Sequence, residues 1–414
     1  MATIAILGTM DTKGEEHAFV AGIIRQRGHK TLVIDVGALE PPKLAPDVPR
    51  EEIAAAAGMD LAQLIARKDR GETIKVMSQG APIVLTRLLH EGKIDGVISL
   101  GGGGGTSIAT SAMRALPVGF PKLMVSTLAS GNTSQYVGVK AIVMFPSIVD
   151  VAGINRISRE ILARAAGAIS GMVETIPPKS ATGEKPIIVA SMFGNTTACV
   201  QHAKKILEAE GFEVLVFHAT GVGGRTMESL IEAGMVDGVL DITTTEWADE
   251  LVGGFLGAGP HRLEAAAKTG TPAVVTPGCL DMVNFYAPDS VPERFRDRRF
   301  YQHNPQVTLM RTNAEENAEL GRIIAQKLNA SQGPVSVLIP RKAISVISAP
   351  GQSFHDPEAD AALFDAIKKN IRSDLPVVEL DTEINDPAFA ERCARTLLQH
   401  IRSGTARKAN TPRN

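Results

Sequence analysis

Short apolar segments alternate with longer amphipathic ones along most of the chain. Residues 3–7 form an unbroken apolar run, which is typical of a strand buried on both faces. The next segment carries an apolar helical stripe that includes Phe19, Val20 and Ile23, and residues 30–36 predict a second strand. This order predicts an α/β fold with parallel sheets covered by helices.

The pattern continues to a segment with the composition of a linker. We expect helices over 51–67 and 72–91, strands over 95–100 and 122–126, and a long helix capped by Asp150. Residues 177–186 are rich in proline and small polar residues, which favours a linker. The first subdomain is therefore predicted to span residues 1–180.

The second half repeats the first. Gly92-Lys-Ile-Asp-Gly-Val97 corresponds to Gly234-Met-Val-Asp-Gly-Val239, and the strands over 187–191 and 214–217 match the first two strands. We expect residues 306–310 and 335–339 to complete the second sheet. Although any two strand–helix units look somewhat alike, the repeated motif favours an internal duplication. The second subdomain is predicted over 181–405, followed by a frayed tail over 406–414.

A run of glycines follows the strand over 95–100 and precedes a predicted helix. Such a loop points backbone N–H groups at a ligand above the helix N-terminus, which is a site for an anion. Thr106 or Ser107 can cap that helix. The loop is not a P-loop, because no Lys-Ser/Thr pair follows it, and the alternative is a tight turn without a ligand. The run consists of Gly101, Gly102, Gly103, Gly104 and Gly105.

Composition narrows the classes of function. The net charge is −2 and the pI is near 6.5, which argues against nucleic acid as an obligate partner. No apolar run approaches the roughly 20 residues needed to span a bilayer, and the N-terminal residues do not resemble a signal peptide. The three cysteines are far apart, which fits a reducing compartment. We expect a cytoplasmic protein with no membrane and no nucleic-acid partner.

Several longer motifs point to one family. They are Gly8-Thr-Met-Asp-Thr-Lys-Gly-Glu15, Gly104-Gly-Thr106, Leu128-Ala-Ser-Gly-Asn132, Thr243-Thr-Thr-Glu246 and the stretch from His303 to Arg311. Together they resemble the bacterial relatives of the ATP-binding N-terminal region of the plant tobamovirus-resistance protein, an uncharacterised family. The resemblance implies two Rossmann-like subdomains, ATP bound in the first of them, and a homodimer.

Loop positions suggest where the nucleotide lies. We expect its phosphates over the glycine run, and Asp11 either holds Mg²⁺ or caps the neighbouring helix. Gly37 is placed to let the adenosine approach. The other predicted contacts, which close the site from the first loop, continue the glycine run or complete the rim, are Thr9, Thr12, Lys13, Thr106, Ser107, Ser130, Gly131 and Asn132.

The second half carries polar residues where the first has glycines. We regard Glu246, Asp249, His303 and His355 as candidate catalytic residues, and a structural ion-pair network between the subdomains is the alternative. Asn195, Asp281, Arg294 and Arg299 accompany them. No zinc-type spacing occurs.

Two functions follow from these residues. Either the protein uses ATP to act on or sense a small metabolite at the cleft between the subdomains, or it is a non-catalytic nucleotide-binding regulatory or interaction module. An NAD-dependent dehydrogenase is disfavoured because the dinucleotide fingerprint is absent.

Overall fold

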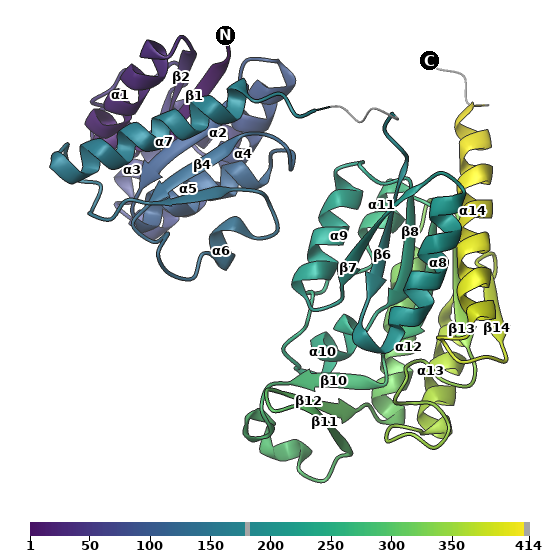
Figure 1. Cartoon of the computed structure of the whole chain (residues 1–414). Coiled ribbons are helices and arrows are strands. Elements are labelled where there is room, and N and C mark those ends of the chain that lie inside the picture. The colour runs from purple at the N-terminus through teal and green to yellow at the C-terminus, as the bar shows by residue number, and fades with distance from the viewer. Residues whose placement is uncertain (179–182, 410–414) are drawn as a thin grey trace. The chain divides into compact units, whose positions relative to one another are not determined.

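Figure 1 presents the protein as a computed structural model, which describes residues 1–178 and 183–409. The chain forms two compact units, Met1–Lys179 and Ser180–Asn414, called unit 1 and unit 2 below. The predicted linker lies partly outside the described residues, as do residues 410–414 of the predicted tail. Residues 406–409 belong to the last helix, α14 (Pro387–Ala409).

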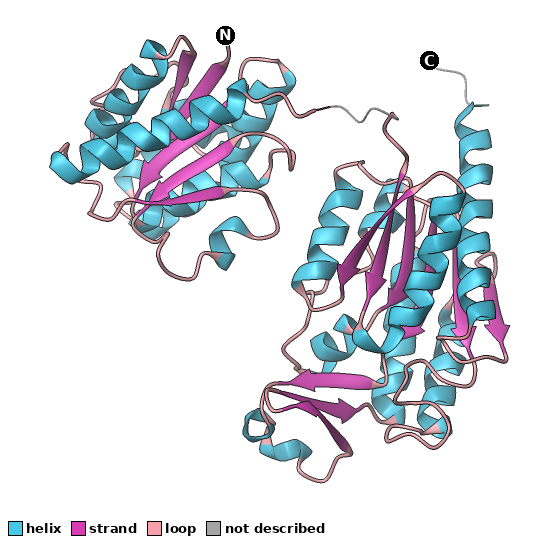
Figure 2. Ribbon diagram, in the orientation of Figure 1, coloured by secondary structure: helices cyan, strands magenta, loops and turns pink. Residues whose placement is uncertain are grey.

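Unit 1 is a five-stranded parallel sheet in the order β2-β1-β3-β4-β5. Helices lie on both faces of the sheet (Figure 2). In chain order its elements are β1 (Thr3–Gly8), α1 (Met10–Gln26), β2 (Lys30–Asp35), α2 (Arg50–Ala56), α3 (Leu61–Ala66), α4 (Arg70–His90), β3 (Gly96–Gly101), α5 (Gly103–Arg114), β4 (Lys122–Ser126), α6 (Ser134–Val137), β5 (Val143–Pro146) and α7 (Arg156–Glu174).

The position of strand β1 between two cores explains why its apolar run is unbroken. Its side chains alternate between two cores: Ile4 and Ile6 pack with residues of α1 and α7, while Ala5 and Leu7 pack with residues of α4 and α5. Both faces are buried, so polar residues would have no place on either side. The continuous apolar pattern is therefore the signature of this central parallel strand.

Unit 2 contains a six-stranded parallel sheet in the order β14-β13-β9-β8-β6-β7 and a separate three-stranded antiparallel sheet. In chain order its α-helices and strands are β6 (Ile187–Met192), α8 (Thr197–Ala209), β7 (Glu213–His218), α9 (Val222–Glu232), β8 (Gly238–Thr243), α10 (Glu246–Val252), α11 (Ala265–Thr269), β9 (Ala273–Gly278), β10 (Met282–Phe285), β11 (Phe300–Asn304), β12 (Val307–Arg311), α12 (Ala314–Asn329), β13 (Val335–Pro340), α13 (Pro357–Asn370), β14 (Val377–Leu380) and α14.

The two units share strand order. Reading β6, β7, β8, β9 and β13 as the counterparts of β1 to β5 gives the same sequence of neighbours in both sheets. The repeated motif also bonds identically: the Asp95 carboxylate accepts from the Thr3 N–H at 2.7 Å, and the Asp237 carboxylate accepts from the Ile187 N–H at 2.8 Å. The predicted fold class of two Rossmann-like parallel-sheet subdomains is confirmed, and these contacts support their origin by duplication.

One predicted strand lies elsewhere. Residues 306–310 were expected to complete the second main sheet, but the strand found there, β12, pairs antiparallel with β10 and β11 in the small sheet. The reason is local, because β11 and β12 form a hairpin in which Asn304 pairs with Val307. An apolar run reveals a strand but not the sheet to which it belongs.

Two helix boundaries also differ from the prediction. The helix expected over 51–67 is divided into α2 and α3 at Gly58, whose φ of +74° ends the first helix, and Asp60 caps the second. The long helix α7 is capped by Asn155 through a capping box with Ser158, and not by Asp150. Asp150 is therefore left in the loop between β5 and α7.

Within residues 1–178 and 183–409, no helix combines the length and apolar composition that crossing a membrane requires.

Candidate functional site

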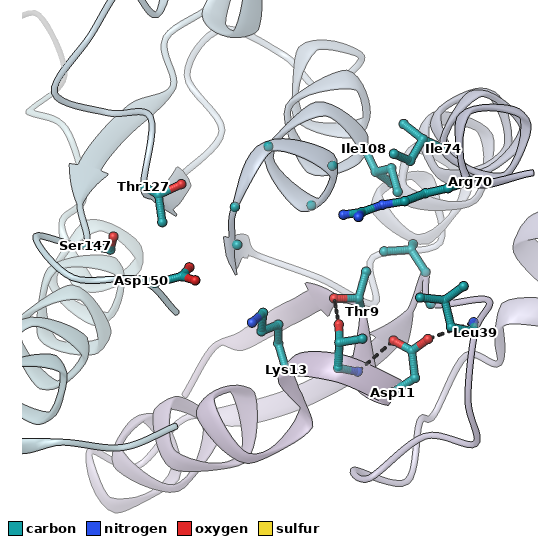
Figure 3. Close-up of a pocket in the computed structure, with 18 of the residues that line it drawn as sticks. Thr9, Asp11, Lys13, Leu39, Arg70, Ile74, Ile108, Thr127, Ser147 and Asp150 are labelled. Atoms are coloured by element: carbon teal, nitrogen blue, oxygen red, sulfur yellow. Dashed lines mark hydrogen bonds between the residues drawn. The ribbon is translucent and has the colours of Figure 1, made fainter. Parts of the chain in front are cut away.

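Unit 1 contains a pocket of about 630 Å³ at the carboxyl edge of its sheet (Figure 3). The segment after β1 and the glycine loop after β3 both line it. These two strands are neighbours, and the strand order reverses between them because β1 continues to β2 on one side whereas β3 continues to β4 on the other. In open parallel sheets this switch point is where ligands bind.

The glycine loop forms the centre of the pocket. Gly102 is the N-cap of α5, and Gly103, Gly104 and Gly105 form its first turn. N–H groups in the first turn of a helix have no acceptor within the helix, and the helix dipole adds partial positive charge. A Cβ on Gly103 would meet nothing within 4 Å, so this side of the loop faces open space. The loop thus presents bare amides to an anion.

Two cationic side chains enter the pocket from different elements. Figure 3 shows Lys13 directed toward the glycine loop from α1 and Arg70 entering from the start of α4. Lys13 has φ and ψ of −126° and 21°, which break the helical geometry of α1 after its first turn. Together with the amides of α5, these cations place positive charge beside the glycine loop.

Asp11 joins the loops after β1 and β2. Its Oδ2 atom accepts from the Leu39 N–H at 2.9 Å, and its Oδ1 atom accepts from the Thr12 N–H at 2.7 Å. The carboxylate is only 3% exposed, and a Cβ on Gly37 would collide with it. Asp11 is therefore not the cap of α1, whose N-cap residue is Thr9, and both its oxygens are engaged by backbone amides.

Asp35, at the end of β2, holds the same two loops through hydrogen bonds. Its Oδ1 atom accepts from the N–H groups of Met10, at 3.0 Å, and Gly37, at 2.8 Å. Its Oδ2 atom is buried and has no hydrogen-bond partner among the described residues. Burial raises the pKa of this carboxyl above its ordinary value.

The opposite end of the pocket is formed by the segments after β4 and β5. Thr127 and Ser130 line it from the first segment, and Ser147, Ile148 and Asp150 line it from the second. Thr127 and Asp150 are both exposed. This end offers hydroxyl and carboxylate oxygens, in contrast to the cations near the loop after β1.

Most residues of the predicted nucleotide site share this pocket, although their contacts with a nucleotide stay predictions. The lining includes Thr9, Asp11, Thr12, Lys13, Gly37, Gly101, Gly102, Gly103, Gly104, Gly105 and Ser130. It does not include Thr106, Ser107, Gly131 or Asn132. Thr106 is fully buried, and its hydroxyl hydrogen-bonds with that of Ser126 at 2.7 Å, so it anchors α5 to β4 and does not cap the helix.

The sequence prediction missed two groups of lining residues. Arg70, Thr73 and Ile74 come from α4, and residues 147–150 come from the loop after β5. Both have a recognisable signal: a crossover helix in a parallel sheet begins at the carboxyl edge, and so does the loop that follows any strand. Placing the first turn of α4 at the carboxyl edge of the sheet would have brought Arg70 into the predicted site.

In unit 2, side chains of the protein occupy the place that corresponds to the pocket of unit 1. The Glu246 carboxylate accepts from the N–H groups of Gly221, at 2.7 Å, and Gly224, at 3.1 Å, and from Arg262 Nε at 2.7 Å. Arg262 also pairs with Asp241 and Glu228. Both Glu246 and Arg262 are buried, so the geometry favours the alternative of a structural ion-pair network, located within unit 2.

The other catalytic candidates are scattered. Asp249 is buried against Asn284, whose backbone N–H and side-chain amide each donate to it at 2.7 Å, and burial raises the pKa of Asp249 to about 7. His303 lies on the exposed strand β11. His355 is half-buried, with Nδ1 3.2 Å from the Ser348 carbonyl. The structure does not gather these residues around one cavity, and their catalytic role stays a prediction.

Two family models match the chain. The model described as the N-terminal domain of Uncharacterised protein family (UPF0261) matches residues 2–178, and the C-terminal domain of the same family matches residues 185–401. The chain belongs to this family. The division between the two models falls in the segment that joins unit 1 and unit 2.

Comparisons with individual proteins support the family assignment. A UPF0261 protein of Clostridium tetani is 52% identical over 396 residues, which cover 95% of this chain and 98% of that protein. The ToMV resistance protein Tm-1(GCR237) of Solanum lycopersicum is 43% identical over 336 residues, which cover 80% of this chain and 45% of the tomato protein. The predicted resemblance is confirmed.

Solved structures are more distant. A UDP-N-acetylglucosamine 2-epimerase from Rickettsia bellii aligns with a TM-score of 0.23 and 12% identity, covering 66% of this chain and 78% of that one. A thioesterase domain from the curacin biosynthetic pathway has a TM-score of 0.26 and 13% identity, covering 52% and 91%. Likenesses at this level carry no argument about function.

Proposed function

We propose that unit 1 binds ATP with its phosphates on the backbone amides of the Gly101–Gly105 loop. The observation that carries this proposal is the open pocket at the β1/β3 switch point, where the free amides of α5 face Lys13 and Arg70. Three sources of positive potential from three elements suit a polyphosphate better than a single carboxylate.

The adenosine then extends toward the loop after β2. Val36, Gly37, Ala38 and Leu39 line that end of the pocket, and Leu39 leaves 59% of its surface exposed there. An exposed apolar side chain beside backbone polar groups suits a base, which has an apolar face and a polar edge. The hydrogen bond from the Leu39 N–H to Asp11 keeps this wall in place.

The use made of ATP divides our proposal into two forms. In the first, the protein acts on or senses a small metabolite. In the second, it is a non-catalytic nucleotide-binding regulatory or interaction module. Metal-dependent ATP turnover, measured with and without candidate metabolites, separates them: binding without turnover supports the module. In unit 2 the Glu246 carboxylate occupies the place that corresponds to the nucleotide pocket, which favours one nucleotide per chain.

Substitution of Gly103 tests the phosphate site. A Cβ at this position meets open space, so Gly103→Val should keep the fold while placing two methyl groups where the phosphates bind. We expect ATP affinity, measured by isothermal titration calorimetry, to fall by at least about tenfold, the equivalent of 1.4 kcal/mol.

Gly171→Val is the matched control, because Gly171 lies in α7 and its Cβ would also meet nothing within 4 Å. Its ATP affinity should equal that of the wild type. Unchanged affinity in Gly103→Val, with melting temperatures similar across all three proteins, would contradict the proposed site.

We also propose that the protein is a cytoplasmic homodimer. Light scattering coupled to size exclusion tests the oligomeric state, and a mass near that of the 43.8 kDa chain would contradict a dimer.

A further inference from the structure

We infer that the end of the pocket formed after β4 and β5 holds the divalent cation that accompanies the nucleotide, with the Asp150 carboxylate and the Thr127 hydroxyl as its protein ligands. This inference rests on the proposed ATP site and assigns the metal to residues other than Asp11.

The charge of Asp150 is the first argument. Figure 3 shows its side chain pointing into the pocket toward Lys13, and no hydrogen bond or ion pair engages its carboxylate among the described residues. A free carboxylate beside bound phosphates repels them, and the repulsion is stronger in a pocket than in water. A cation between the carboxylate and the phosphates attracts both, so the net interaction becomes favourable.

Thr127 supplies the second ligand from the adjacent strand end. Its Oγ1 atom lies 3.8 Å from the position that a Cβ on Gly102 would take, so the hydroxyl stands beside the glycine loop. Its backbone N–H donates to the Gly101 carbonyl at 3.3 Å, which ties the two segments together. Mg²⁺ takes oxygen ligands, usually one or two from protein and others from phosphates and water. A loop hydroxyl on such an ion is known from the P-loop.

The backbone before Asp150 is held in a strained form. Ile148 has φ of +63°, and the Val149 N–H donates to the Ser147 carbonyl across it at 2.7 Å, which makes a γ-turn. A positive φ is unusual for a β-branched residue. The Ser147 hydroxyl donates to the Val149 carbonyl at 2.6 Å, and the Ser147 N–H donates to the Ser126 carbonyl at 3.1 Å. These contacts stabilise a segment that projects Asp150 into the pocket.

Asp11, the carboxylate predicted from sequence, is less suited to the metal. Both its oxygens already accept from backbone amides, and a metal on Oδ2 would compete with the Leu39 N–H that holds the loop after β2. No group of three or more histidine, cysteine, aspartate or glutamate side chains that suits a metal occurs within the described part of the chain. The cation therefore needs phosphate oxygens and arrives with the nucleotide.

Calorimetry of ATP binding in Mg²⁺ and in EDTA tests the inference. In the wild type we expect Mg²⁺ to tighten ATP binding. Asp150→Asn should reduce this Mg²⁺ enhancement by about tenfold or more, the range seen when a metal site loses a supporting group. In EDTA the same variant should bind ATP at least as tightly as the wild type, because a repulsive charge is gone. Thr127→Val should reduce the enhancement to a smaller extent.

Glu40→Gln is the matched control. Glu40 is an exposed acid that follows Leu39 and does not line the pocket, so its loss removes one negative charge without touching the proposed ligands. Its Mg²⁺ enhancement should equal that of the wild type. Mn²⁺ bound with ATP gives an independent readout, since its paramagnetic resonance spectrum should change in Asp150→Asn.

The outcomes separate the two proposals. If the wild type binds ATP and Asp150→Asn keeps the full Mg²⁺ enhancement, the inference is wrong and the proposed ATP site stands. If Asp150→Asn loses affinity equally with and without Mg²⁺, Asp150 supports the fold of the pocket and is not a metal ligand. If the wild type binds no ATP under either condition, the proposed function itself fails.

Discussion

Gly37 lies so close to the carboxylate of Asp11 that a Cβ at residue 37 would overlap Asp11 Oδ1. Glycine at this position therefore lets the loop after β2 close over Asp11, whose Oδ2 atom accepts from the Leu39 N–H. We expected Gly37 to give space to the adenosine. That stays a prediction, and the structure shows a further reason for glycine here, because the absent side chain lets two walls of the pocket come together.

Substitution of Gly37 by alanine should open this junction. The new methyl group forces Asp11 or the loop to move, and overpacking of this kind costs about 1–3 kcal/mol. Hydrogen exchange measured by mass spectrometry should show faster exchange in peptides covering residues 36–40, with weaker ATP binding. Gly22→Ala, where the Cβ meets nothing within 4 Å, should leave exchange at residues 36–40 unchanged. Equal exchange in both variants would mean that the Asp11 contact is not required.

Lys13 and Arg70 should control the dependence of ATP binding on salt. Each cation attracts the phosphates through a pocket that ions screen, so affinity in the wild type should fall as NaCl is added. Lys13→Met and Arg70→Met should each weaken binding and flatten this dependence. Lys30→Met is the control, because Lys30 begins β2 and so lies at the far edge of the sheet. A salt dependence unaltered in both pocket variants would show that neither side chain meets the phosphates.

Asp249 should make the stability of unit 2 depend on pH. An aspartate in an unfolded chain has a pKa near 4, and burial raises the pKa of Asp249 to about 7. Between these values the folded state binds a proton that the unfolded state lacks. The contribution of Asp249 to the free energy of unfolding should therefore be highest below about pH 4 and fall as pH rises toward 7, by on the order of 1.4 kcal/mol per pH unit.

Asp249→Asn should reduce that slope. The substituted amide keeps an acceptor for the Asn284 N–H. Its new NH2 replaces the oxygen that accepts from Asn284 Nδ2, so the Asn284 amide should flip and accept through Oδ1, which has no partner among the described residues. Urea unfolding followed by the fluorescence of Trp247, the only tryptophan, reports on this region. An equal slope in variant and wild type would show that the Asp249 proton is not the one involved.

Glu246 should matter for stability and not for nucleotide binding. Glu246→Ala leaves Arg262 buried with one partner fewer and two glycine amides unsatisfied, a type of change that costs about 3–5 kcal/mol. Glu246→Gln retains acceptor atoms for the amides and should cost less. Trp247 fluorescence measures the unfolding of unit 2, and calorimetry measures ATP binding. A loss of ATP turnover in Glu246→Gln without a loss of stability would instead favour the catalytic role first considered.

The sequence by itself determined most of the buried parallel strands, their alternation with helices and the repetition of this design. Buried parallel strands must be apolar on both faces, so β1 and β6 are visible as short continuous runs. The paired motifs that contain Asp95 and Asp237 made the duplication visible. Each aspartate has the same structural role, which is to accept a hydrogen bond from the first residue of a neighbouring strand. The glycine loop was evident because a strand that ends in five glycines leaves bare amides at a helix start.

Tertiary structure alone decided which loops meet. Arg70 and Asp150 are far from the glycine loop in sequence, and only the strand order, with its reversal between β1 and β3, brings α4 and the loop after β5 to one pocket. It also decided that Thr106 is buried against Ser126 and that Glu246 is held by Arg262, because burial and pairing depend on what the rest of the chain packs around a side chain. Local pattern specifies elements, and their packing specifies the site.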